Sequence, residues 1–187
     1  MKITAGESDS ATDGRRPSTK GYPAAGAGLL AAACGGLLLV LFPPLELELF
    51  ARGAAQLAGL LSGAPVLRSA EGWLLPSANL PVLVTSACSG ADYFLIVAVL
   101  LGWHLSRRGR ALPRAVLCGT VFACPLAIAV NALRIATLAQ MHRWFIPLLP
   151  VSYAPFLHML TGVAVFLPAL IALHLLLEYH GRHHHHP

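Results

Sequence analysis

The stretch that decides the fold is SGADYFLIVAVLLGWHLSRRGRALPRAVLCGTVFACPLAIAVNAL, residues 89–133, in which two apolar segments flank a basic loop. A helix needs about 20 mostly apolar residues to cross a bilayer, and the segments 89–105 and 112–133 are close to this length. The loop contributes the arginines Arg107, Arg108, Arg110 and Arg114. Short arginine-rich loops stay on the cytoplasmic side. The sequence therefore predicts two membrane helices joined by a cytoplasmic loop.

The rest of the chain extends this pattern to four membrane helices. Apolar segments at 22–43 and 157–179 are the other two candidates, and 56% of the 187 residues are hydrophobic while 11% are charged. Soluble domains have about 25% charged residues, so the composition favours a membrane protein. Residues 1–21 are polar and predict a disordered tail, and residues 180–187 form a histidine-rich tail. We expect one membrane domain, residues 22–179, with both termini cytoplasmic.

Two connections, residues 44–88 and 131–157, are predicted on the outer face. In the first, residues 45–63 carry two glutamates and an arginine, so they suit an amphipathic helix in the membrane interface rather than a span. Residues 64–88 are short apolar stretches interrupted by turn formers, which is typical of an extended hairpin. The predicted fold class is an all-α membrane protein with about four transmembrane helices, an interfacial helix and a short hairpin-like excursion.

Three reactive side chains fall where apolar segments meet the outer face. Cys88 precedes the second span, Arg134 follows the third, and His158 opens the fourth. A thiol at a helix start is a candidate nucleophile, a guanidinium is a fixed cation, and an imidazole exchanges protons near pH 7. The arginines that set the topology are independent of these three residues. We therefore expect a shared pocket equipped for acyl transfer by a cysteine.

Three neighbouring residues are candidates for supporting roles. Asn131 lies three positions before Arg134, on the same helical face, and could orient it. Asp92, one turn after Cys88, could pair with Arg134 or stabilise the helix start, and the structural role is favoured. Ser89 is a small polar neighbour of the thiol.

The remaining cysteines and histidines carry no comparable signal. Cys34, Cys118 and Cys124 lie inside apolar runs, where cysteine packs as a small hydrophobe. The histidines His104, His142 and His174 show no partners in the sequence. The four-histidine tail could hold a metal, but it has no zinc-site spacing, and we expect a solvated terminus. We expect no cofactor, no metal and, without interleaved basic and aromatic residues, no nucleic-acid partner.

The order of three motifs resembles the exosortase/archaeosortase family over residues 22–178. These motifs are ACSG at 87–90, NALRI at 131–135 and a histidine opening the last span, with GAPVLR and LPSANLPVLV upstream. The chain differs in being short, with fewer spans than longer members, and in having ADYF after ACSG. The resemblance implies a polytopic cysteine transpeptidase of a bacterial cytoplasmic membrane, whose cysteine, arginine and histidine are Cys88, Arg134 and His158. It also implies substrates with a carboxy-terminal sorting signal of short motif, transmembrane helix and basic cluster, as in PEP-CTERM proteins.

The hypothesis from sequence is a membrane-embedded cysteine transpeptidase or protease that cleaves such a signal at the outer face and transfers the product to an acceptor. Its expected partners are membrane-anchored substrates, whose helices would approach the glycines Gly90, Gly102, Gly119 and Gly162. A non-catalytic scaffold or assembly subunit is one alternative, and a small transporter is another. Hydrolysis by the same three residues, without transfer, is a third.

Overall fold

Four long apolar helices dominate the computed structural model, which describes residues 21–77, 80–145, 147–148 and 150–183. They are α1 (Gly21–Leu41), α3 (Ala91–Arg107), α4 (Leu112–Phe145) and α5 (Ala154–His183), and all four are long and apolar enough to cross a membrane. The predicted all-α membrane fold is confirmed. The predicted tails lie outside the described residues except for Gly21 and residues 180–183, which are helical.

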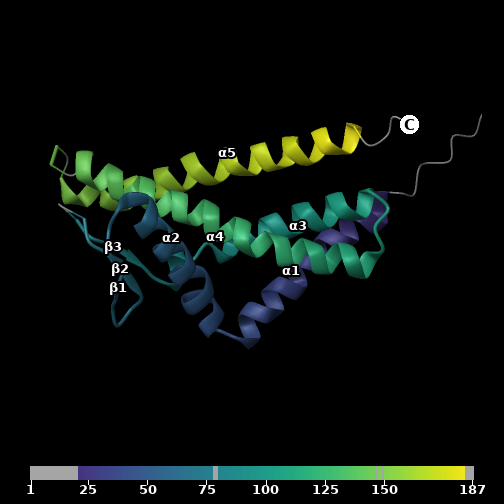
Figure 1. The fold of residues 1–187 in the computed structure, drawn as a ribbon, viewed down its shortest axis with the longest axis horizontal. Helices are drawn as coiled ribbons and strands as arrows, with labels where there is room; N and C mark the ends of the chain where they lie inside the picture. Colours follow the sequence, from purple (N-terminus) through teal and green to yellow (C-terminus); the bar gives the residue numbers. More distant parts are fainter. Residues whose placement is uncertain (1–20, 78–79, 146, 149, 184–187) are drawn as a thin grey trace, which may run out of the picture.

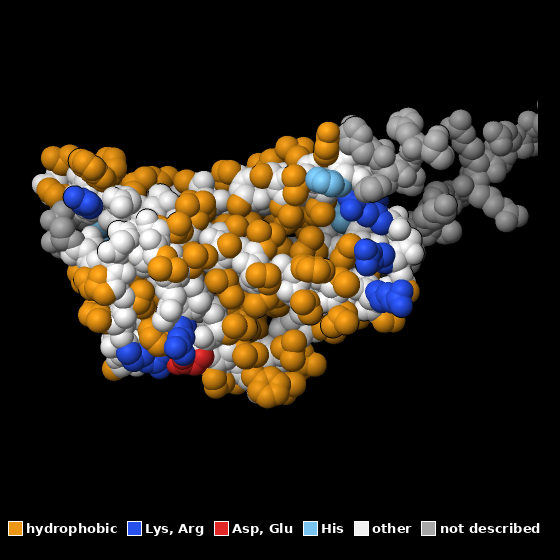
Figure 2. All heavy atoms as spheres, in the orientation of Figure 1, with side chains coloured by type: hydrophobic (Ala, Val, Ile, Leu, Met, Phe, Trp, Pro, Cys, Tyr) orange, Lys and Arg blue, Asp and Glu red, His pale blue; other side chains and the backbone are white. Residues whose placement is uncertain are grey.

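Different elements of the fold lie at the two ends of the molecule. The end of α4, the start of α5 and a small sheet lie at one end, and the loop between α3 and α4 lies at the other (Figure 1). Hydrophobic side chains cover the middle of the face in Figure 2, whereas charged side chains gather towards its ends. This distribution suits a protein surrounded by lipid at its middle.

The helix α4 is longer than a bilayer requires. At 1.5 Å per residue its 34 residues extend about 51 Å, against about 30 Å for the hydrocarbon core. Arg134 lies 22 positions after Leu112, which places the two residues about 33 Å apart along the axis. The helix therefore carries Arg134 across roughly one hydrocarbon thickness from the basic loop.

The segment between α1 and the sheet is helical, as the sequence predicted. A π-helix, η1 (Leu45–Ala51), runs directly into α2 (Arg52–Ser62), which ends at Gly63 in the left-handed conformation (φ 67°). The buried face of α2 consists of small residues, Ala54, Ala55, Ala58 and Gly59. These small side chains let α2 lie close to α4.

The predicted hairpin is a three-stranded antiparallel sheet of β1 (Leu67–Arg68), β2 (Trp73–Leu75) and β3 (Val82–Val84). The Trp73 indole donates a hydrogen bond to the Leu47 carbonyl of η1 (3.2 Å). The Arg68 guanidinium donates to the Glu48 carboxylate (2.7 Å). The buried face of the sheet packs on α4, so the strand that leads to Cys88 is held against the helix that carries Arg134.

Glycines bring α1, α3 and α4 into contact. A Cβ on Gly102 of α3 would lie 2.9 Å from the Ala27 carbonyl oxygen of α1, and one on Gly119 of α4 would lie 2.9 Å from the Gly102 nitrogen. These glycines were expected to admit a substrate helix. That expectation was wrong, because the space beside Gly102 and Gly119 is occupied by other helices of the same chain. By contrast, Leu157 and Thr161 are the only buried side chains among those described in α5.

We expect Gly102→Leu to lower stability by about 1–3 kcal/mol or more, because the new side chain meets the backbone of α1. The measurement is the thermal unfolding midpoint of the purified protein in detergent. Gly26→Leu is the matched control, since a Cβ at Gly26 meets nothing within 4 Å. Equal midpoints for the two variants would contradict the packing.

Candidate active site

Cys88 lies in a tight connection between the sheet and α3. It ends a short 3-10 helix, η2 (Ser86–Cys88), and its backbone N–H donates to the Thr85 carbonyl (3.0 Å). Gly90 then caps α3 with φ 82°, a left-handed conformation that favours glycine. A Cβ on Gly90 would lie 3.0 Å from the Cβ of Asn131 on α4. The connection that carries the thiol is therefore pressed directly onto α4.

Asn131 ties this connection to the arginine. Its side-chain nitrogen donates to the carbonyl oxygens of Cys88 and Ser89, both at 2.8 Å, and its side-chain oxygen accepts from Arg134 Nη1 at 3.4 Å. The side chain is fully buried. The sequence predicted the contact between Asn131 and Arg134. It did not predict the hydrogen bonds to residues 85–90, which we call the Cys88 connection, because they depend on how this segment folds back on α4.

The three predicted reactive side chains meet at one atom. His158 Nε2 lies 3.5 Å from Cys88 Sγ and 2.5 Å from Arg134 Nη2. A guanidinium can only donate hydrogen bonds, so the Nε2 that it contacts is unprotonated and the imidazole proton is on Nδ1. The site thus combines a thiol, an unprotonated ring nitrogen and a fixed positive charge, contributed by the η2–α3 connection, α5 and α4.

Aromatic and small residues of α3 and α5 complete the surroundings of Arg134. The guanidinium carbon lies 5.2 Å from the centre of the Phe166 ring, which stacks on Tyr93 at 4.7 Å. A Cβ on Gly162 would lie 3.4 Å from Arg134 Nε, so glycine leaves room for the side chain. Sequence reasoning missed Phe166 and Tyr93. The signal was present for Phe166, since His158, Gly162 and Phe166 recur every four residues on one helical face.

Two cavities join at this site. The polar cavity, about 420 Å³, is bordered by Glu46, Ser86, Ala87, Ser89, Gly90, Ala91, Asp92, Tyr93, Arg134 and Phe166. The apolar groove, about 640 Å³, runs between α3 and α5 and is lined by Asp92, Tyr93, Ile96, Arg134, His158, Met159, Gly162, Val163, Phe166, Leu167 and Leu170. Arg134 borders both, together with Asp92, Tyr93 and Phe166, so the two cavities meet around the guanidinium.

The other supporting residues have structural contacts. Ser89 is buried, and its hydroxyl accepts a hydrogen bond from the Ala91 N–H at 3.3 Å. Asp92 is exposed in the first turn of α3, where an acidic side chain is favourable. Among the described residues no ion pair joins Asp92 to Arg134. The position of Asp92 at the start of α3 suits the structural role favoured for it.

Two histidines form a pair that the sequence did not reveal. His104 Nε2 of α3 lies 3.3 Å from His174 Nδ1 of α5, at the opposite end of α3 from Cys88. The interpretation that both lack partners was therefore wrong. The pairing depends on the register of α3 against α5, which the sequence pattern does not define.

A family model described as Transmembrane exosortase (Exosortase_EpsH) matches residues 18–175. The match includes the four long helices almost entirely, together with Cys88, Arg134 and His158. No curated protein and no solved structure matched the chain. The extent of the family match and the four membrane-spanning helices lead to one conclusion: this chain belongs to the transmembrane exosortase family.

Proposed function

We propose that this protein is a cysteine transpeptidase that cleaves a carboxy-terminal sorting signal at the outer face of the membrane and transfers the product to an acceptor. The observation that carries the proposal is the shared contact of Cys88 Sγ and Arg134 Nη2 with His158 Nε2. Membership of the exosortase family supports a role in sorting-signal processing. The nucleophile is Cys88, the cation is Arg134 and the proton carrier is His158.

In the first half-reaction His158 Nε2 takes the thiol proton and the Cys88 thiolate attacks the scissile carbonyl carbon. A C–S bond forms, and the carbonyl oxygen becomes an oxyanion that Arg134 stabilises; such donors are typically worth about 3–4 kcal/mol. The intermediate then collapses, the C–N bond breaks, and the leaving amine takes the proton from His158. The product is a thioester on Cys88.

In the second half-reaction an acceptor amine attacks the thioester carbonyl and gives its proton to His158 Nε2. The C–S bond breaks and the Cys88 thiolate regains its proton from the imidazole. Water in place of the amine gives hydrolysis by the same steps. Transfer and hydrolysis therefore differ only in the group that enters the site.

Arg134 has to move during this cycle. Neutral His158 has one lone pair on Nε2, and in the structure the guanidinium and the thiol both lie within reach of it. When a substrate carbonyl enters, the N–H of Arg134 turns to the developing oxyanion and releases Nε2 to accept the thiol proton. Substrate binding and activation of Cys88 are thereby coupled.

Each of the two cavities binds a different part of the substrate. The polar cavity borders the Cys88 connection and suits the short motif around the scissile bond. The apolar groove continues from His158 along α5, where Met159, Val163 and Leu167 are exposed and can contact the substrate's own membrane helix. Small and apolar surfaces are the usual partners of a helix in lipid.

Replacing Cys88 should abolish processing. We expect Cys88→Ala and Cys88→Ser to lower the cleavage rate by about 10³-fold or more, because the covalent step is lost. The measurement is cleavage of a co-expressed protein ending in a motif, an apolar helix and a basic tail. Cys118→Ala is the control and should cleave at the wild-type rate. Normal processing by both Cys88 variants would end the nucleophile assignment.

Arg134→Lys tests the geometry of the cation. One ammonium cannot reproduce the fork that contacts Asn131 and His158, so we expect processing to fall about 10²–10³-fold. Membrane insertion and the thermal midpoint serve as controls for folding. Full activity of this variant would show that a positive charge alone suffices.

Asn131→Leu should loosen the Cys88 connection. It leaves the Cys88 and Ser89 carbonyls without their donor, and each unpaired buried group costs about 1–3 kcal/mol. We expect a lower thermal midpoint and a changed alkylation rate of Cys88 by iodoacetamide. Gln140→Leu, an exposed position on the same helix, is the matched control. An Asn131 variant indistinguishable from this control would contradict the role assigned to the amide.

A further inference from the structure

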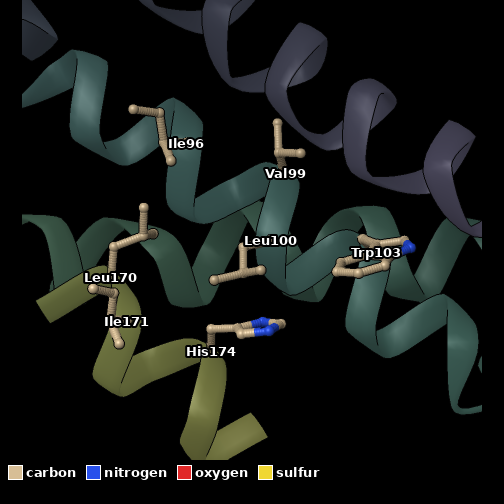
Figure 3. A pocket seen from close by; sticks show the side chains of 7 residues that line it. All are labelled: Ile96, Val99, Leu100, Trp103, Leu170, Ile171 and His174. Atoms are coloured by element: carbon tan, nitrogen blue, oxygen red, sulfur yellow. The ribbon is translucent and has the colours of Figure 1, made fainter. Parts of the chain in front are cut away.

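A second groove lies between α3 and α5, nearer the basic loop than the site. Its walls are Ile96, Val99, Leu100 and Trp103 from α3 and Leu170, Ile171 and His174 from α5, and it encloses about 520 Å³ (Figure 3). We call it the tryptophan groove. The lining is apolar except for the imidazole of His174, which lies beside the indole of Trp103.

This groove shares Ile96 and Leu170 with the apolar groove of the site, and contacts between α3 and α5 flank it at both ends. Towards the site the rings of Tyr93 and Phe166 stack at 4.7 Å. Towards the basic loop His104 contacts His174, and the Arg108 guanidinium donates to the Leu177 carbonyl. An α-helix with its side chains is about 10–12 Å wide, so it does not fit between the Trp103 and His174 rings of this groove, whose centres lie 6.5 Å apart. A thin, flexible hydrocarbon chain does fit.

The length of the gap between α3 and α5 corresponds to one leaflet. Trp103 lies ten residues after Tyr93, which is about 15 Å along the helix axis. Half of a hydrocarbon core of about 30 Å is the same length. One acyl chain entering beside Trp103 therefore reaches the level of Tyr93, below the catalytic residues.

The entrance is mainly basic, with one carboxylate nearby: Glu178 Oε1 lies 3.8 Å from His174 Nε2. The Arg107 guanidinium lies 5.1 Å from the centre of the Trp103 ring, and the Trp103 and His174 rings are nearly parallel, 6.5 Å apart. Arg108, Arg110 and Arg114 are exposed nearby, and the sequence from 104 to 114 contains no acidic residue. Figure 2 shows basic side chains gathered at this end of the molecule. Juxtamembrane arginines attract anionic lipids.

We propose that the tryptophan groove is a binding site for an anionic phospholipid. One acyl chain lies between α3 and α5, and the phosphate sits at the guanidinium of Arg107 beside Trp103 and His174. The bound lipid fills the gap left by the sparse packing of α5 and so holds this helix, which carries His158, against α3. The lipid site adjoins the apolar groove, with which it shares Ile96 and Leu170, but the proposal does not rest on the proposed catalysis.

The test uses the purified full-length protein in detergent, with phosphatidylglycerol, phosphatidylcholine of the same acyl chains, or glycerol phosphate added. We expect phosphatidylglycerol to bind, by native mass spectrometry, and to raise the thermal midpoint. The other two probes should not, because one lacks net charge and the other lacks an acyl chain. Equal binding of the two lipids, or an equal effect of glycerol phosphate, overturns the proposal.

Two variants separate the chain site from the charge site. Leu100→Trp fills the groove and should weaken phosphatidylglycerol binding at least about tenfold, whereas Leu117→Trp, exposed on α4, should not. Arg107→Gln should weaken binding about fivefold. Its control is Arg52→Gln, which removes an arginine 5.2 Å from the Trp73 ring. Ile171→Trp repeats the test from the opposite wall if Leu100→Trp does not fold. Full binding by the groove-filling and Arg107 variants overturns the proposal.

Discussion

The hydrogen bonds of the Asn131 amide are the interaction on which the rest of the site depends. One buried side chain on α4 donates to two consecutive carbonyls of the Cys88 connection and accepts from Arg134. Two buried carbonyls without that donor would each cost about 1–3 kcal/mol. The amide therefore fixes the distance between the thiol and the guanidinium, and the left-handed Gly90 permits the close approach that those bonds require.

The elements that carry Cys88 and Arg134 are packed more tightly than α5, which carries His158. Cys88 and Arg134 belong to a body in which α1, α3 and α4 contact through glycines and the sheet packs on α4. His158 belongs to α5, whose described side chains are almost all partly or fully exposed. Elements with few buried contacts open most readily. Motion of α5 would therefore change the His158 contacts while leaving the bonds between Asn131 and the Cys88 connection intact.

The sequence was sufficient for the fold class and for the end of the molecule at which Cys88, Arg134 and His158 gather, because apolar length defines the membrane helices and the alternation of spans and connections brings the three residues to the same end. It was not sufficient for contacts that depend on helix register. The His104–His174 pair and the stacking of Phe166 beneath Arg134 are of this kind. Nor could glycine positions alone reveal whether Gly102 faces a substrate or, as found, another helix of the same chain.

The position of Arg134 follows from the length of α4 and from the cost of burying charge. A guanidinium near the middle of a membrane helix costs roughly 2.5–3.5 kcal/mol on insertion scales, and at about 33 Å from Leu112 it is already near the far boundary. There it lies between the polar cavity and the apolar groove, with Phe166 beneath it. A cation at such a boundary attracts the polar part of a chain whose remainder stays in lipid. The same placement that makes Arg134 tolerable in a membrane therefore also suits the membrane-anchored substrate that we propose.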